Sequence, residues 1–98
     1  YEEGGENSVL NGDAGSEAYL HEVPGGSPLM GERNRGVETQ FDYGARAGVW
    51  RVMRLFAAQK FNFTVYGVGR ALELNPDAAR AFADAGHEVA SHAWRWFD

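Results

Sequence analysis

The pattern of hydrophobic and polar positions is clearest in the second half of the chain. Over residues 43–60, apolar side chains recur every three or four positions, and this spacing predicts an amphipathic helix. Apolar and polar residues then alternate over 61–66, so a strand is expected there. Gly67 and Gly69 allow the turn that follows. The apolar stripe of the predicted helix consists of Ala45, Val49, Val52, Met53 and Phe56.

A second helix and a second strand follow in the same order. Asn75 is a typical N-cap residue and Pro76 is preset for the first helical turn, so a helix is expected over about 75–85. Gly86 ends this helix, and the short apolar segment 87–91 is predicted to be a strand. Helices that alternate with strands predict an α/β fold, in which right-handed helical crossovers join parallel strands.

The first part of the chain has the composition of a loop. It is rich in glycine, asparagine and acidic residues, with Pro24-Gly25-Gly26-Ser27-Pro28 near its centre, and it predicts a long loop at about 4–40. Such a long connection is usually either functional, as a lid or binding loop, or disordered. Both alternatives stay open, although a few apolar residues could anchor a lid. These residues are Tyr19, Leu20, Val23, Leu29 and Met30.

Size, charge and composition narrow the possible functions. The chain has 98 residues, which suits one small domain and is too short for a closed α/β barrel. Its net charge of −5 opposes a generic phosphate-binding surface, so nucleic acid is not expected as a partner. No apolar run approaches the about 20 residues of a membrane span, so no membrane partner is expected. The absence of cysteine excludes disulfides, thiolate zinc sites and a cysteine nucleophile, and it is compatible with a cytoplasmic location.

Two acidic residues and a histidine stand where catalytic groups are expected. In parallel α/β sheets, ligands bind at the carboxyl ends of the strands, where Glu2, Glu3 and His92 would meet if another strand precedes them. One glutamate could serve as a general base with the other as its partner, and His92 could polarise a carbonyl, shuttle a proton or bind a metal. The alternatives are solvated acids and a structural histidine, because adjacent strand residues face opposite ways unless the chain bends. No functional role is predicted for His21 or His87.

Aromatic and cationic residues surround this predicted site. Such groups can wall a pocket, stack on a planar ligand or stabilise developing negative charge. Arg46 projects near the apolar stripe of its helix, where arginine is unfavourable unless it is paired or functional. A salt bridge to Asp42 or Glu38 is the structural alternative for Arg46, and a hydrophobic plug is the alternative for the tryptophans. The residues predicted to bind substrate are Arg46, Trp94, Arg95 and Trp96.

Several segments taken together resemble a known family. Tyr1-Glu2-Glu3-Gly4, the Asn75-Pro76 helix and Ala85-Gly86-His87-Glu88-Val89-Ala90-Ser91-His92 resemble the polysaccharide deacetylase, or NodB-homology, superfamily. Residues 1–6, 43–51 and 91–96 resemble its allantoinase branch. The resemblance implies that residues 1–98 form part of a distorted (β/α) barrel of the polysaccharide deacetylase type, with further strands outside this piece. We therefore expect the isolated piece to be inactive, and either to aggregate or to be marginally stable.

The departures from the deacetylase pattern bear on metal binding. The resemblance implies that metal-dependent relatives carry two aspartates after the first strand and two histidines four residues apart after a later strand. Glu2 and Glu3 stand at the aspartate positions, and Trp96 replaces the second histidine that would follow His92. A metal held by three protein groups would lose one of them. No metal and no other cofactor is therefore expected, and zinc belongs only to the deacetylase alternative.

The function implied by the resemblance is hydrolysis of a cyclic amide. An allantoinase adds water across the hydantoin ring of allantoin and gives allantoate, which requires a base, donors for the oxyanion and recognition of a flat polar ring. Glu2 or Glu3 is predicted to be the base and His92 the oxyanion stabiliser or proton shuttle. The expected partner is a small ureide substrate. The resemblance also implies that the protein forms a homo-oligomer, specifically a tetramer. A metal-dependent deacetylase of N-acetylated polysaccharide, another cyclic-amide hydrolase and a non-catalytic ligand-binding barrel stay open as alternatives.

Overall fold

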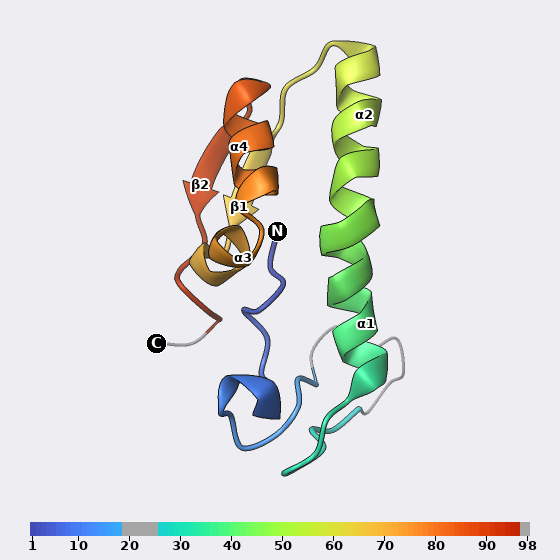
Figure 1. The fold of residues 1–98 in the computed structure, drawn as a ribbon, viewed down its shortest axis with the longest axis vertical. Helices are drawn as coiled ribbons and strands as arrows, with labels where there is room; N and C mark the ends of the chain where they lie inside the picture. The colour runs from blue at the N-terminus through green and yellow to red at the C-terminus, as the bar shows by residue number, and fades with distance from the viewer. Residues whose placement is uncertain (19–25, 97–98) are drawn as a thin grey trace.

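The computed structural model describes residues 1–18 and 26–96, in which helices alternate with two short strands (Figure 1). In chain order the elements are the 3₁₀ helix η1 (Val9–Asn11), α1 (Arg35–Tyr43), the π-helical segment η2 (Gly44–Gly48), α2 (Val49–Gln59), β1 (Thr64–Gly67), α3 (Gly69–Leu74), α4 (Pro76–Asp84) and β2 (Glu88–Ser91). α4 lies against the sheet, and the long helix formed by α1, η2 and α2 runs beside it. No helix in these ranges combines the length and apolar character that crossing a bilayer requires.

The long helix begins earlier than the sequence predicted. The Asn34 side chain accepts a hydrogen bond from the backbone N–H of Val37 (3.2 Å), and this cap starts the helix at Arg35. The predicted loop at about 4–40 therefore ends at Asn34. Gly44 and Gly48 lie inside the helix, where the π-helical segment joins α1 to α2. Both glycines lie within the predicted range 43–60. The part that was missed, residues 35–42, has only two apolar side chains, Val37 and Phe41, which are too few to predict a helix from the hydrophobic pattern.

Polar contacts hold the described parts of the predicted loop. Glu17 is buried and accepts hydrogen bonds from the backbone N–H and the side-chain amide of Asn7 (3.1 and 3.0 Å). The Ser16 N–H donates to the Leu29 carbonyl (3.0 Å) and so joins the two sides of the loop. Leu29 and Met30, two of the expected apolar anchors, are exposed, so buried polar groups anchor this segment. The expected anchors that lie outside the described residues are Tyr19, Leu20 and Val23.

The two strands pair in parallel, as predicted. Thr64 stands opposite Glu88, and the register continues to Gly67 opposite Ser91. β1 does not begin at Phe61, as the alternation suggested, because the paired register starts only at Thr64. Within the described residues the sheet has two strands, so the barrel stays a prediction.

Tyr1 lies along the other edge of β1. Its amino group donates to the Tyr66 carbonyl (2.8 Å), and its carbonyl accepts from the Val68 N–H (3.0 Å). Two such bonds on either side of Gly67 form the pattern of a parallel bridge. The residues that follow Tyr1 and those that follow β2 therefore leave the sheet at the same end.

The helix α3 (Gly69–Leu74) was not predicted from the sequence. The N–H groups of Gly69 and Arg70 donate to the carbonyls of Ala93 and Trp94 (2.9 and 3.0 Å), so residues beyond β2 satisfy the first turn of this helix. The Trp94 ring packs on Gly69, where a Cβ atom would lie 2.5 Å from the ring. Because these partners are far away in the sequence, the local pattern indicated only a turn.

α4 carries the core of the described structure. The Asn75 side chain accepts from the Ala78 N–H (3.2 Å), and Gly86 follows the helix with a φ angle of 73°, so both predicted ends are confirmed. Phe82 of α4 is 1% exposed and packs against Val65 of β1. The core therefore lies between α4 and one face of β1, while the opposite face of β1 carries exposed side chains.

Candidate active site

Two polar side chains from distant parts of the chain meet beyond the ends of the strands. Glu2 follows Tyr1 in a turn that is closed by a hydrogen bond from the Gly5 N–H to the Glu2 carbonyl (2.8 Å). His92 follows β2, and its backbone N–H donates to the Gly67 carbonyl (3.1 Å). The His92 Nε2 and the Glu2 Oε1 are 2.9 Å apart. The structure thus joins two of the three residues predicted to be catalytic, and we call them the carboxylate–imidazole pair.

The carboxylate–imidazole pair is open to a small ligand. The Glu2 and His92 side chains are 32% and 47% exposed. An ionised carboxylate only accepts hydrogen bonds, so the His92 Nε2 carries the proton that it donates to Glu2. A neutral His92 then has one acceptor nitrogen, Nδ1. A cavity of about 250 Å³ adjoins the pair and is lined by Glu2, His92, Ala93, Arg95 and Trp96.

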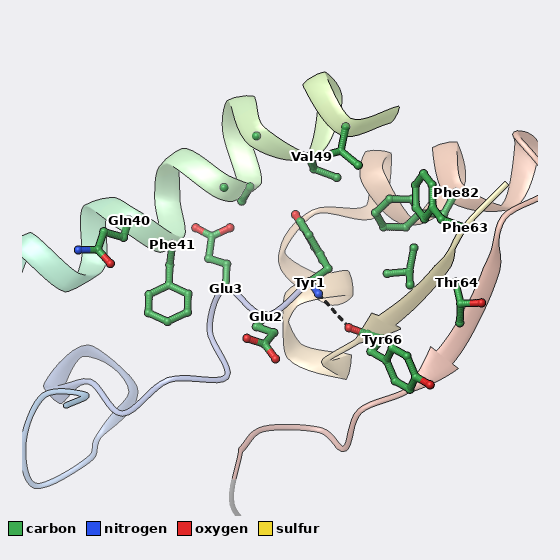
Figure 2. A pocket seen from close by; sticks show the side chains of 15 residues that line it. Tyr1, Glu2, Glu3, Gln40, Phe41, Val49, Phe63, Thr64, Tyr66 and Phe82 are labelled. Carbon is green, nitrogen blue, oxygen red and sulfur yellow. Dashed lines mark hydrogen bonds between the residues drawn. The ribbon is translucent and has the colours of Figure 1, made fainter. Parts of the chain in front are cut away.

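Glu3 faces the other way. Figure 2 shows its carboxylate pointing to the long helix, whereas the Glu2 carboxylate points away from that helix. Both glutamates border a larger cavity of about 580 Å³, whose other walls are mainly apolar side chains of β1 and the long helix. The chain bends at Gly4, which has a φ angle of 88°, but the bend does not bring both carboxylates to His92.

The carboxyl group of Glu3 is electrostatically perturbed. Burial raises its pKa, and the neighbouring carboxylates of Asp42 and Glu6 raise it further, while Arg46 opposes the rise. The folded chain therefore holds this proton more tightly than the unfolded chain does. The stability that this proton confers is fully present at low pH and is lost as the pH rises above 4.5, the ordinary pKa of the group.

Replacing Glu3 by glutamine is expected to stabilise the protein more at about pH 7 than at about pH 4, because the amide cannot ionise. Urea unfolding of both proteins at the two pH values measures this difference. Glu32→Gln, at an exposed glutamate, is the matched control and should change the free energy of unfolding by about 0.5 kcal/mol or less. A larger gain at low pH would mean that Arg46 outweighs burial and the two carboxylates.

Arg46 pairs with a residue of its own helix. Its Nε donates to the Asp42 Oδ1 (2.5 Å), one turn earlier, and the side chain is largely exposed. Glu38, the other partner considered, bonds to Arg33 instead (2.7 Å). Arg46 does not line the cavity beside the carboxylate–imidazole pair. The salt bridge to Asp42 is confirmed, and a role of Arg46 in substrate binding stays a prediction.

The two tryptophans have different surroundings. Trp96 lines the cavity beside the pair, and its ring meets Phe41 edge-on with ring centroids 5.7 Å apart. Its indole N–H is buried and has no hydrogen-bond partner in the part of the chain that the structure describes. Trp94 packs on Gly69 and is more than half exposed. The structure therefore brings Trp96, but not Trp94, to the cavity.

Arg95 forms hydrogen bonds with the segment that follows Tyr1. Its guanidinium donates to the Asp13 carboxylate (2.6 and 3.2 Å) and to the carbonyls of Gly4 (3.2 Å) and Glu6 (2.8 Å). The sequence predicted a substrate contact here, whereas the described contacts link the segment after β2 to the first residues of the chain. Asp13, which the sequence analysis did not name, is part of this link, and nothing in the local pattern marks it.

Tyr66 is a second residue near the site that the sequence analysis did not name. It lies on the face of β1 opposite to the buried Val65, and its ring is 6.3 Å from the His92 ring in an edge-on arrangement. The alternation over 61–66 held a signal for it, because Tyr66 falls on the side of the strand away from the core.

The carboxylate–imidazole pair contains two side chains that could coordinate a metal ion. Catalytic zinc sites use three protein ligands. Within residues 1–18 and 26–96, no group of three or more His, Cys, Asp or Glu side chains is placed to hold a metal. Trp96 stands where the metal-dependent relatives are expected to carry a histidine. Its indole N–H only donates hydrogen bonds and cannot coordinate a metal ion. The described residues therefore do not fit a three-ligand metal centre.

Comparison with known sequences points to one family. The model of the family described as "Polysaccharide deacetylase" matches residues 31–98. A curated protein of Schizosaccharomyces pombe (strain 972 / ATCC 24843), named "Putative polysaccharide deacetylase", is 44% identical over 100 residues, which cover 100% of this chain and 31% of that protein.

Two solved structures match the whole chain. The crystal structure of "Puue Allantoinase" matches with a TM-score of 0.92 and 49% identity, over 100% of this chain and 32% of that chain. The crystal structure of "probable Polysaccharide deacetylase from Pseudomonas aeruginosa PAO1" matches with a TM-score of 0.92 and 47% identity, over 100% of this chain and 33% of that chain. The chain thus spans about a third of the length of these relatives.

Proposed function

The chain belongs to the polysaccharide deacetylase family, a family of hydrolases, and we propose that the protein carrying it opens the cyclic amide ring of allantoin. The observation that carries the proposal is the 2.9 Å contact between Glu2 and His92, beside a cavity that Trp96 helps to line. The likeness to Puue Allantoinase, at 49% identity and a TM-score of 0.92, supports the same substrate class.

In this proposal the carboxylate–imidazole pair activates a water molecule. The Glu2 carboxylate orients His92 by accepting a hydrogen bond from its Nε2–H, and Nδ1 takes a proton from water as the water oxygen attacks the ring carbonyl carbon. The tetrahedral intermediate collapses with cleavage of the ring C–N bond, and the proton on Nδ1 passes to the leaving nitrogen. Water supplies the oxygen of the new carboxyl group and the proton on nitrogen, and its second proton is released to solvent when the carboxyl group ionises, so no further reactant is needed.

The surroundings of the pair favour a small, flat, polar substrate. The adjoining cavity of about 250 Å³ lies just below the about 300 Å³ at which ligand pockets usually begin. Trp96 offers an aromatic surface on which a planar ring can stack. A net charge of −5 disfavours a strongly anionic substrate.

Deacetylation of an N-acetylated polysaccharide is the second candidate function. The names of the Schizosaccharomyces pombe and Pseudomonas aeruginosa relatives favour it, as does the description of the family. The resemblance implies a metal ion for that reaction. Three protein ligands are expected, and the described residues supply two, Glu2 and His92. We therefore propose ring opening without a metal as the first candidate.

The test is hydrolysis of allantoin by the full-length protein after exhaustive chelation, with the metal content of the same sample measured. We expect ring opening to persist without stoichiometric metal. An N-acetylated chitooligosaccharide assayed in parallel separates the two candidates, and we expect no release of acetate from it. Acetate release that zinc restores after chelation would establish the second candidate, and tight ureide binding without turnover would indicate a non-catalytic barrel.

A further inference from the structure

One side chain, Arg95, docks the segment after β2 onto the first turn of the chain. Its Nε donates to the Gly4 carbonyl (3.2 Å), and its Nη2 donates to the Glu6 carbonyl (2.8 Å). The residue between them, Gly5, accepts a hydrogen bond at its own carbonyl from the Trp96 backbone N–H (3.2 Å). Two neighbouring residues beyond β2 therefore hold three consecutive carbonyls of the turn.

A partly buried ion pair fixes the direction of Arg95. Asp13 receives two hydrogen bonds from the guanidinium, at 2.6 Å from Nη2 and 3.2 Å from Nη1. The Arg95 and Asp13 side chains are 16% and 15% exposed. Hydrogen bonding from Arg95 holds the pKa of Asp13 below its ordinary value, so the carboxylate stays charged at neutral pH. A bidentate pair of this kind constrains a guanidinium more tightly than a single contact does.

These contacts leave Arg95 little capacity to bind a substrate. The guanidinium has five N–H groups, and four hydrogen bonds already run from it to Asp13 and to two backbone carbonyls. A turn toward a ligand would leave the Asp13 charge without its compensating partner. The geometry therefore argues against the substrate contact that the sequence predicted.

The turn that Arg95 holds is the turn that carries Glu2. The Gly5 N–H donates to the Glu2 carbonyl (2.8 Å), so a displacement of this turn displaces Glu2, while His92 lies on the same segment as Arg95. We propose that Arg95 is a positioning residue that sets the contact between Glu2 and His92 and does not bind substrate. This inference rests on the function proposed for the carboxylate–imidazole pair.

The first test is the kinetics of allantoin hydrolysis by the full-length protein with Arg95→Met, which keeps the unbranched stem and removes the guanidinium. We expect kcat to fall about 100-fold, because a misplacement of about 1 Å has an effect of this size. Arg95 lines the cavity beside the pair, but its guanidinium bonds to Asp13 and to the turn, so KM should change by less than about threefold. Arg80→Met, at an exposed arginine paired with Asp77 on α4, is the matched control and should retain kcat and KM.

Asp13→Asn tests the same link from its other end. It removes the charge that fixes Arg95 and should lower kcat with KM nearly unchanged. The double variant Arg95→Met/Asp13→Asn should be no slower than Arg95→Met alone, because both changes break one link. If Arg95→Met does not fold, Asp13→Asn and Arg95→Lys carry the test, since lysine keeps the charge but cannot form the bidentate pair.

Two kinetic results would overturn the proposal. A raised KM with unchanged kcat in Arg95→Met would assign Arg95 to substrate binding, and unchanged kinetics in the variants would leave it without a role in the site. If the unaltered protein hydrolyses no ureide, the proposed function fails by itself. Crystal structures of the unaltered protein and Asp13→Asn then decide the positioning role. A wider Glu2–His92 separation in the variant supports it, and one that stays near 2.9 Å overturns it.

Discussion

Replacing His92 by alanine is expected to lower the turnover of allantoin by the full-length protein about 100-fold or more, because general acid–base catalysis contributes at least this much. In the proposed reaction His92 takes a proton from water and returns it to the leaving nitrogen. KM should change little, since the imidazole acts on water and on the developing charge. Steady-state kinetics at saturating allantoin measure the loss, and unchanged turnover would remove His92 from the mechanism.

Glu2→Gln probes the same contact from the carboxylate side. Glutamine keeps the shape of the side chain but removes the charge that orients His92 across 2.9 Å. Because the two groups act as a unit, Glu2→Gln/His92→Ala should be no slower than His92→Ala alone. Glu73→Gln, at an exposed glutamate of α3, is the matched control and should retain turnover. Losses that add fully would mean that the two groups act independently.

The largest effect on stability is expected for Phe82→Ala. Phe82 is 1% exposed, packs against Val65 and meets the rings of Tyr1 and Phe63 edge-on, with centroids 5.7 and 6.3 Å away. Truncation removes this contact area and leaves a cavity between α4 and β1, so the free energy of unfolding should fall by about 3–5 kcal/mol. Denaturant unfolding of the full-length protein measures the change.

Phe61→Ala is the matched control, because it deletes the same atoms from a side chain that is 64% exposed. It should cost less than about 1 kcal/mol. A loss for Phe82→Ala as small as that of the control would mean that the space between α4 and β1 collapses on truncation and that this core contributes little.

Local signals were enough for the elements whose ends are set by their own residues. Asn75 caps α4 and Gly86 follows it with a positive φ angle, and both were predicted because a cap or a stop acts within one turn. The apolar stripe from Ala45 to Phe56 likewise predicted the helix that lies beside the sheet. In each case the physical cause lies within a few residues of its effect.

Elements that depend on distant partners were missed or misplaced. α3 is stabilised at its start by the carbonyls of Ala93 and Trp94, and β1 starts where its register with β2 starts. The early start of the long helix is a different case, because residues 35–42 carry only two apolar side chains and the hydrophobic pattern there is too sparse to predict a helix. Backbone partners far away in the sequence leave no local signal.

The sequence by itself determined the α/β alternation, the parallel pairing and the candidates Glu2, Glu3 and His92, because periodicity, caps and strand ends are local properties. Only the tertiary structure decided that Glu2 meets His92 while Glu3 faces the long helix. It also decided that Arg95 holds the loop. Which of several suitable side chains meet depends on the direction in which each leaves its turn, and contacts across the whole chain set that direction.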